Sequence, residues 1–216
     1  IQVEYLQDWL AKPVEISGNK QAAWRTDPAQ SGPGGCIADI GTHAFNLATF
    51  VTGLVPSAVL ADLTAFGPGR ALDDNAAVLL RFESGAKGMI WASQVAPGSK
   101  NGLRIRVAGE AGGLLWDHER PDDLQYTPIG KATRTLQHGG DGVATPGRLP
   151  AGHPEGYLEA FATLYAEAAG QVRGYRGGTK PSINILLPTV SDGLAGMRFI
   201  SAAARSSEEG GIWVGL

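Results

Sequence analysis

The spacing of apolar residues along the chain shifts between two periods, and these periods predict the secondary structure. Several short segments place an apolar residue at every second position, and three longer segments place one at every third or fourth. A period of two is typical of strands, and the longer period is typical of amphipathic helices. We expect strands at residues 1–6, 57–66, 75–82, 86–95, 103–108 and 114–116, with short strands continuing to about 127, and helices at about 35–52, 154–169 and 189–206.

Strands dominate the middle of the sequence. Residues 103–108 alternate strictly between apolar side chains and arginines, so the two faces of this strand meet different surroundings. Residues 75–82 and 86–95 flank Glu83-Ser84-Gly85, a short turn with a glycine, which predicts a β-hairpin. Because hairpins join antiparallel strands, a mainly antiparallel sheet is expected.

Each predicted helix has an apolar stripe, and sequence signals mark where the helices begin or end. Gly53 closes the first helix, Pro154 suits the first turn of the second, and Thr189 with Asp192 resembles a capping box at the start of the third. All three stripes can be buried on one face of the sheet. The stripes are Cys36, Ile40, Ala44, Leu47 and Val51, then Leu158, Phe161, Leu164, Tyr165 and Ala168, and then Val190, Leu194, Met197 and Ile200.

Two stretches show little periodicity. Residues 10–34 are rich in Pro, Gly, Ser and Asn and are expected to form a long ordered loop that carries Trp24 and Arg25. Loops of this length in compact domains are usually functional. Residues 128–152 are also expected to be irregular.

The order of elements predicts one α+β domain over residues 1–216. A helix, a block of antiparallel strands and two further helices fit a sheet with helices on one face. The open face also carries apolar residues, such as Leu79, and we expect it to mediate formation of a homo-oligomer. Ile1 is not a start methionine and lies within an alternating segment, which suggests a piece of a longer protein.

Composition narrows the classes of function. The net charge is −3 with scattered Lys and Arg residues, which gives no reason to expect a nucleic acid or an anionic membrane as partner. A single cysteine rules out an intrachain disulfide. No apolar run approaches the roughly 20 residues that span a bilayer, and no signal peptide is visible. These features favour a cytoplasmic enzyme.

The clearest candidate chemistry lies on the first predicted helix. Asp39 and His43 are four residues apart, so they share a face at the border of the apolar stripe, and Asn46 extends the polar strip. A histidine suits proton transfer near neutral pH, and a neighbouring carboxylate can orient it. The glycines before the helix, Gly34 and Gly35, would let a ligand approach the backbone. The alternative is an acid that favours a helix N-terminus and a half-buried structural histidine.

Several motifs accompany this helix, and their combination is more specific than any one of them. They are Trp24-Arg25-Thr26-Asp27, Gly34-Gly35-Cys36-Ile37-Ala38-Asp39-Ile40-Gly41-Thr42-His43, Asp73-Asp74-Asn75-Ala76, Phe82-Glu83-Ser84-Gly85-Ala86-Lys87-Gly88, Leu103-Arg104-Ile105-Arg106-Val107-Ala108-Gly109 and His153-Pro154-Glu155-Gly156-Tyr157. Together they resemble the C-terminal substrate domain of the Gfo/Idh/MocA family, which includes glucose–fructose oxidoreductase and inositol dehydrogenase.

The resemblance implies a two-domain oxidoreductase that acts on a sugar, a polyol or a related secondary alcohol. An N-terminal Rossmann domain would bind NAD or NADP, and the C-terminal domain, similar to that of glyceraldehyde-3-phosphate dehydrogenase, would build the substrate site and the subunit interface. His43 would take the hydroxyl proton as hydride leaves the adjacent carbon. Asp39 would orient His43 or hold a substrate hydroxyl, and a lysine of the Rossmann domain would complete the group.

The nucleotide site that the family requires is not found in these residues. No Gly-x-Gly-x-x-Gly lies between a strand and a helix, and the glycine-rich segment 109–113 leads into another strand-like segment. We therefore expect the nucleotide to bind outside residues 1–216. On its own, this chain is expected neither to bind NAD(P) nor to be active.

Other residues are weaker candidates for the substrate site. Arg25 would bind a polar substrate or form a surface ion pair with Asp27, and Trp24 would line a sugar ring or simply pack. His153 would reach the substrate cleft, or cap a helix or face solvent. Asn101 lies at the mouth of a strand.

Two further hypotheses belong to other classes of protein. In one, the domain only binds a ligand or forms oligomers, and Asp39 and His43 are idle. In the other, the chain is a metal-dependent lyase or hydrolase that uses Asp39, His43 and His153, although the spacing of these residues is not that of a convincing metal site. No metal is expected.

Overall fold

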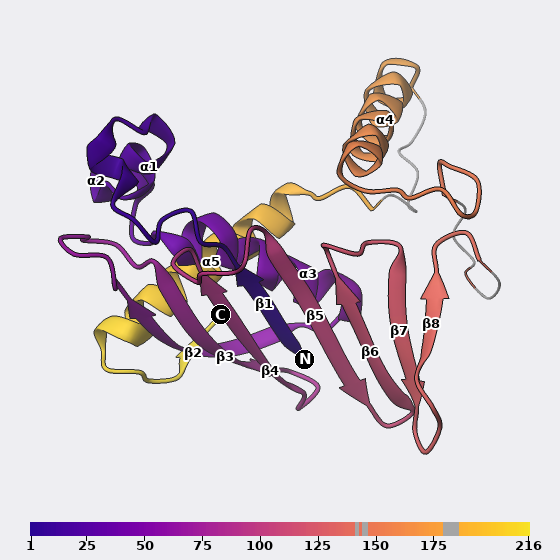
Figure 1. The fold of residues 1–216 in the computed structure, drawn as a ribbon, viewed down its shortest axis with the longest axis horizontal. Helices are drawn as coiled ribbons and strands as arrows, with labels where there is room; N and C mark the ends of the chain where they lie inside the picture. The colour runs from indigo at the N-terminus through magenta and orange to yellow at the C-terminus, as the bar shows by residue number, and fades with distance from the viewer. Residues whose placement is uncertain (141–142, 144–146, 179–185) are drawn as a thin grey trace.

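The computed structural model describes residues 1–140, 143, 147–178 and 186–216. Within them, one nine-stranded sheet has the order β8-β7-β6-β5-β1-β4-β3-β2-β9 (Figure 1). β1 is parallel to β4 and antiparallel to β5, and every other neighbouring pair among these strands is antiparallel. The mainly antiparallel sheet is therefore confirmed. The strands are β1 Gln2–Leu6, β2 Pro56–Thr64, β3 Asn75–Phe82, β4 Lys87–Ser93, β5 Gly102–Gly109, β6 Gly112–Asp117, β7 Asp123–Pro128, β8 Arg134–Gln137 and β9 Val214–Gly215.

The strands follow the predicted alternation in the middle of the sheet. β3 and β4 form the expected hairpin, and in β5 Ile105 is buried while Arg104 and Arg106 are exposed. β8 is a departure, since it lies in the stretch that was predicted to be irregular. Its four residues are mostly exposed and show no apolar alternation, and it is held by backbone pairing to β7.

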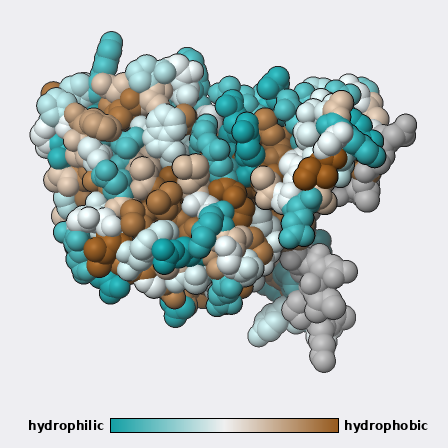
Figure 2. Space-filling view, turned by 90° about the horizontal axis from the view of Figure 1, so that it is seen from below, coloured by the Kyte–Doolittle hydropathy of each residue, from teal (hydrophilic) through white to brown (hydrophobic). Residues whose placement is uncertain are grey.

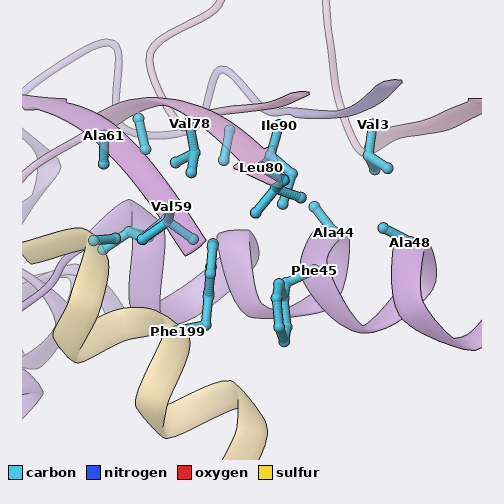
Figure 3. Packing of buried hydrophobic residues seen from close by; sticks show 14 of the residues in the cluster. Val3, Ala44, Phe45, Ala48, Val59, Ala61, Val78, Leu80, Ile90 and Phe199 are labelled. Carbon is cyan, nitrogen blue, oxygen red and sulfur yellow. The ribbon is translucent and has the colours of Figure 1, made fainter. Parts of the chain in front are cut away.

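Two helices cover one face of the sheet and enclose the core. α3 (Thr42–Thr52) contacts β1, β4 and β5, and α5 (Val190–Glu208) lies on β2. Figure 3 shows side chains of the strands meeting those of α3 and α5, with Phe45 beside Phe199. The rings of these two residues stack with their centroids 4.3 Å apart. Cys36 is fully buried in this core, as its place in the apolar stripe predicted.

The prediction that all three helical stripes are buried on the sheet is wrong. α4 (Tyr157–Arg176) projects away from the sheet (Figure 1) and has no buried residue. In α5 the buried residues, such as Phe199 and Ala203, lie in the second half, whereas Val190 and Met197 near its start are exposed. Apolar periodicity identifies which face of a helix avoids water, but it does not say what covers that face.

Residues 10–34 are also more regular than expected. They contain η1 (Val14–Ser17), α1 (Lys20–Arg25) and α2 (Pro28–Ser31) instead of a continuous loop. The side chains of Asn19 and Asp27 cap α1 and α2 by accepting hydrogen bonds from backbone N–H groups. Helices of four to six residues are too short to show an apolar period, so the pattern missed them.

The face of the sheet opposite α3 and α5 is open. Leu79, Met89 and Trp91 are exposed on it, and they border a groove that also includes Glu4 and Asp62. The space-filling view from below shows apolar residues reaching the surface among hydrophilic ones (Figure 2). Among the described residues, no helix has the length and hydropathy needed to cross a bilayer.

Candidate functional site

The candidate site is built on the first helix, which starts with an irregular turn. Residues Ile37–Gly41 form a π-helical turn that continues directly into α3. Such turns insert one extra residue into a helix and are frequent at functional sites. Asp39 lies within this turn and His43 lies just after it in α3, so their relative direction differs from that of an ordinary four-residue spacing.

The start of this helix is occupied by a neighbouring loop. The Asp73 carboxylate accepts hydrogen bonds from the backbone N–H groups of Gly35 (2.7 Å) and Ile37 (2.8 Å). A Cβ atom on Gly35 would collide with the carbonyl oxygen of Asp73. The prediction that Gly35 admits a ligand is therefore wrong, because it admits the backbone of the loop before β3; Gly34 is buried against the side chain of Ile37. Burial raises the pKa of Asp73, against the effect of its two backbone hydrogen bonds.

Asp39 is the centre of a polar network. Its Oδ2 atom accepts hydrogen bonds from Arg25 Nε (3.0 Å) and from Gln94 Nε2 (2.7 Å). Gln94 is buried at the end of β4, and its backbone carbonyl accepts from the N–H of Leu10. Among the described residues, Oδ1 of Asp39 has no hydrogen-bond partner. One carboxylate oxygen is thus committed to the protein, and the other accepts no hydrogen bond from the described residues.

Arg25 reaches this carboxylate from α1. Its guanidinium lies over the ring of Trp24, 4.1 Å from the centroid, and 6.0 Å from that of Trp9. Its Nη1 atom donates to the side chain of Gln21 (2.6 Å). The surface pair with Asp27 that we considered is not formed, because Asp27 caps α2 and Arg25 pairs with Asp39.

His43 lies one turn further along α3 and is exposed. Its ring meets that of Tyr5 edge-on, with the centroids 6.2 Å apart. The Tyr5 hydroxyl donates to Asn101 Oδ1 (2.9 Å), which also accepts from Gln7 Nε2. Burial raises the pKa of the Tyr5 phenol, and the negative charge of Asp39 acts in the same direction.

The structure brings some predicted residues together and leaves others apart. No hydrogen bond joins Asp39 to His43 in the described part of the chain, so Asp39 does not orient the imidazole by direct contact. His43 and Asn46 line a groove of 310 Å³ between α3 and the first half of α5. His153 is exposed in the segment before α4, where its ring contacts the carbonyl of Pro150. That segment is tied to the β6–β7 connection by the hydrogen bond from Glu155 N to Asp122.

Several residues of the site were missed from the sequence. Tyr5, Gln7, Trp9 and Gln94 complete the surroundings of Asp39 and His43. They lie just inside or beyond the ends of β1 and β4, the parallel pair of the sheet, where the N–H of Gln7 bonds the carbonyl of Ser93. Because parallel strands end at the same edge, their carboxyl ends form a natural ligand site. Polar residues directly after two apolar strands were the available signal.

The described residues do not fit a dinucleotide. Residues 109–113 form the tight connection between antiparallel β5 and β6, not a strand-to-helix turn. Side chains of the chain itself accept from backbone N–H groups at the starts of α1, α2 and the π-helical turn and at the N-cap residues of α4 and α5. They are Asn19, Asp27, Asp73, Glu159 and Asp192. No cluster of His, Cys, Asp and Glu in the described residues is suited to a metal ion.

Comparisons with known proteins agree with this architecture. The family described as GFO/IDH/MocA C-terminal domain matches residues 1–115. The oxidoreductase YfiI of Bacillus subtilis (strain 168) is 33% identical over 221 residues, which cover 99% of this chain and 56% of that protein. The chain thus spans about half the length of this relative, and its match to a levoglucosan dehydrogenase covers 35% of that protein.

Solved structures extend the match to the whole fold. An oxidoreductase from Sinorhizobium meliloti is 46% identical with a TM-score of 0.82, and the match covers 99% of this chain and 55% of that one. An inositol dehydrogenase homolog from Azotobacter vinelandii, complexed with NAD⁺, is 32% identical with a TM-score of 0.92, covering 100% of this chain and 57% of that one. The chain therefore belongs to the Gfo/Idh/MocA family of oxidoreductases, and its fold is the C-terminal domain of that family.

Proposed function

We propose that this chain is the substrate-side domain of an NAD(P)-dependent dehydrogenase that acts on a secondary alcohol of a sugar or polyol. The observation that carries the proposal is the position of His43. It is an exposed imidazole at the edge of the sheet where β1 and β4 end, beside a network that holds Asp39 with one oxygen unpaired among the described residues. The likeness to an inositol dehydrogenase homolog supports a polyol as substrate.

In this proposal the side chains divide the work on a hydroxylated substrate. His43 takes the proton of the reacting hydroxyl and returns it in the reverse direction, which is typically worth about 10²–10⁴-fold in rate. Asp39 accepts a hydrogen bond from a second hydroxyl through Oδ1, while Arg25 and Gln94 keep its carboxylate in place. Tyr5 supports the imidazole through its ring, and Trp24 offers an apolar wall.

The cofactor belongs to a second domain in this proposal. The nicotinamide would accept the hydride from the substrate carbon, and the described residues provide no cradle for its pyrophosphate. An N-terminal Rossmann domain in the same protein would supply that cradle and a catalytic lysine. The relatives are much longer than the region that matches this chain, and this supports such a domain.

The proposed role of His43 can be tested with the full-length protein. His43→Ala should lower kcat for oxidation of myo-inositol, or of the best substrate in a panel of polyols and sugars, by roughly 10²–10⁴-fold. The affinity for NAD⁺ and NADP⁺, measured by quenching of protein fluorescence, should stay nearly unchanged. His118→Ala is the matched control, since this ring meets that of Trp116 edge-on just after β6, and it should retain most of the activity.

The result also separates this proposal from its alternative, a domain that only binds a ligand or forms oligomers. If His43→Ala keeps more than about half of kcat, proton transfer by this residue contributes far less than general acid–base catalysis usually does. Asp39 and His43 would then be structural, and the alternative would stand.

We also propose that the open face of the sheet joins copies of the protein. Its exposed Leu79, Met89 and Trp91 form an apolar patch of the kind that marks an interface. Light scattering of the full-length protein should give an oligomer mass, and Leu79→Glu should lower it. A monomer mass at high concentration would contradict this proposal.

A further inference from the structure

α4 has an apolar face that nothing in the described chain covers. Its large apolar residues recur at intervals of one to seven residues. At 100° per residue they lie on an arc of about 120° around the helix axis. The rings of Tyr157 and Phe161 lie 4.8 Å apart, and those of Phe161 and Tyr165 lie 6.4 Å apart, so an aromatic ladder runs along this face. The exposed members are Tyr157, Leu158, Phe161, Leu164, Tyr165, Val172 and Tyr175.

The polar side of the same helix is already engaged. Arg148, from the segment before α4, donates to the Thr163 hydroxyl (2.8 Å), which in turn donates to the carbonyl of Glu159. Glu159 accepts from the backbone N–H of Gly156 and so caps the helix. The described chain therefore holds α4 by its polar face, and the aromatic face remains without contact to it. This is the reverse of what a solvent-exposed surface helix does.

The size of the exposed face suits a domain interface. Tyr157, Phe161, Tyr165 and Tyr175 are 67%, 43%, 72% and 85% exposed, and full burial of an aromatic side chain removes roughly 150–250 Å² from water. These four side chains alone offer on the order of 500 Å². A patch of this size is often functional. Buried against an equal area of a partner, it would remove roughly 1,000 Å² from water in total, which falls within the range of about 600–1,500 Å² for inter-domain contacts. It is smaller than the roughly 800 Å² per partner of stable complexes between separate proteins.

The matched structures point to the occupant. The superposition on the NAD⁺-complexed homolog covers 100% of this chain with a TM-score of 0.92, and yet only 57% of that protein. That protein therefore contains the fold described here together with a large additional part of its own chain. α4 and the α1–α2 segment project from the same edge of the sheet (Figure 1), and Arg25, at the end of α1, binds Asp39 of the candidate site.

We infer that the aromatic face of α4 is the surface on which the nucleotide-binding domain of the same protein docks. The inference rests on the proposed function, because that function requires such a domain. A domain in the same chain meets α4 at a high effective concentration, so a modest apolar contact is enough to hold it. The contact would fix the nicotinamide over the site without any residue of α4 touching substrate.

Thiol labelling in the full-length protein tests this surface without requiring turnover. The variants Tyr165→Cys and Phe161→Cys place a thiol on the aromatic face, and Ala166→Cys is the matched control on the far side of the same helix, in a background without other reactive cysteines. Cys36 does not interfere, because it is buried and burial raises the pKa of its thiol well above the ordinary value. Labelling by a maleimide should be slower on the aromatic face by roughly ten-fold or more, since a covered thiol reacts only when the domains separate.

Each other outcome overturns the inference. Equal rates at the three positions mean that the aromatic face is open, and slow labelling at all three means that cover is not specific to it. Protection of Tyr165→Cys that disappears on dilution assigns the face to a second copy. Failure of the proposed function would appear separately, as retained activity in His43→Ala with the labelling pattern unchanged.

Discussion

Replacing Asp39 by alanine probes the network that holds the site together. The substitution removes the acceptor shared by Arg25 and Gln94. Gln94 is buried, so its amide loses a hydrogen bond that water cannot replace, at a cost of about 1–3 kcal/mol. The ion pair with Arg25 is a quarter exposed on both sides and adds at most about 1 kcal/mol. We expect Asp39→Ala to lower the free energy of unfolding by about 1–4 kcal/mol in total.

Both stability and kinetics of the full-length protein report on this change. Trp9 and Trp24 lie beside Arg25, so urea unfolding followed by tryptophan fluorescence senses the site directly. Asp39→Ala should also raise KM and lower kcat together, because the carboxylate holds the substrate as well as ordering its neighbours. Asp39→Asn keeps an oxygen that can accept from Gln94 and should recover most of the lost stability.

A double-mutant cycle decides whether the reasoning is right. If the stranded amide is the main penalty, adding Gln94→Leu to Asp39→Ala removes the unpaired donor, and the combined loss is smaller than the sum of the single losses. Additive losses would refute this account. So would a change below about 0.5 kcal/mol in Asp39→Ala, which is the range of ordinary surface substitutions.

Four further predictions follow from the structure. Arg70→Ala should destabilise the fold by about 3–5 kcal/mol, measured by urea unfolding, because it leaves Asp74 as a buried, unpaired charge; the two side chains are 3% and 1% exposed. The hydrogen bond from Arg70 lowers the pKa of Glu15 below its ordinary value of 4.5. The stability that this interaction contributes is therefore fully present above pH 4.5 and is lost as the pH falls through the lower pKa of the folded state. Glu15→Gln should make the free energy of unfolding less dependent on pH in this acid range, and an unchanged slope would contradict this. Phe199→Ala should cost about 3–5 kcal/mol in thermal or chemical unfolding, because the ring is fully buried and stacked on Phe45. Titration of residues 1–216 with NADH should give no saturable heat at micromolar concentrations, and a tight isotherm would contradict the assignment of the nucleotide site to another domain.

Much of the fold could be read from the sequence because its determinants are local. The alternation in residues 103–108 and the glycine turn at 83–85 reappear as β5 and as the β3–β4 hairpin. The capping residues of the last helix are confirmed, since Asp192 accepts from the backbone and hydroxyl of Thr189. In each case a few neighbouring residues carry the whole signal, because backbone period, turn and cap depend on positions close in the chain.

The position of Asp39 and His43 on one helix was also predictable, but their partners were not. Gln94 is 55 residues from Asp39, and Asn101 is 96 residues from Tyr5. Asn101 meets Tyr5 because β5 pairs antiparallel with β1, and Gln94 meets Asp39 because the π-helical turn packs against β4. No period in the sequence encodes either choice of neighbour. The π-helical turn at 37–41 likewise redirects the two side chains, and its signal is not periodic.

The tertiary structure alone decided where the apolar stripes go. The sequence showed that the apolar residues between 158 and 168 lie on one face of a helix. Only the structure shows that this face of α4 does not pack on the sheet and is exposed. It also shows that Gly35, before α3, receives Asp73 and not a ligand. The physical reason is common to both. Local pattern determines which groups must leave water or find a partner, whereas the partner is set by contacts between distant segments.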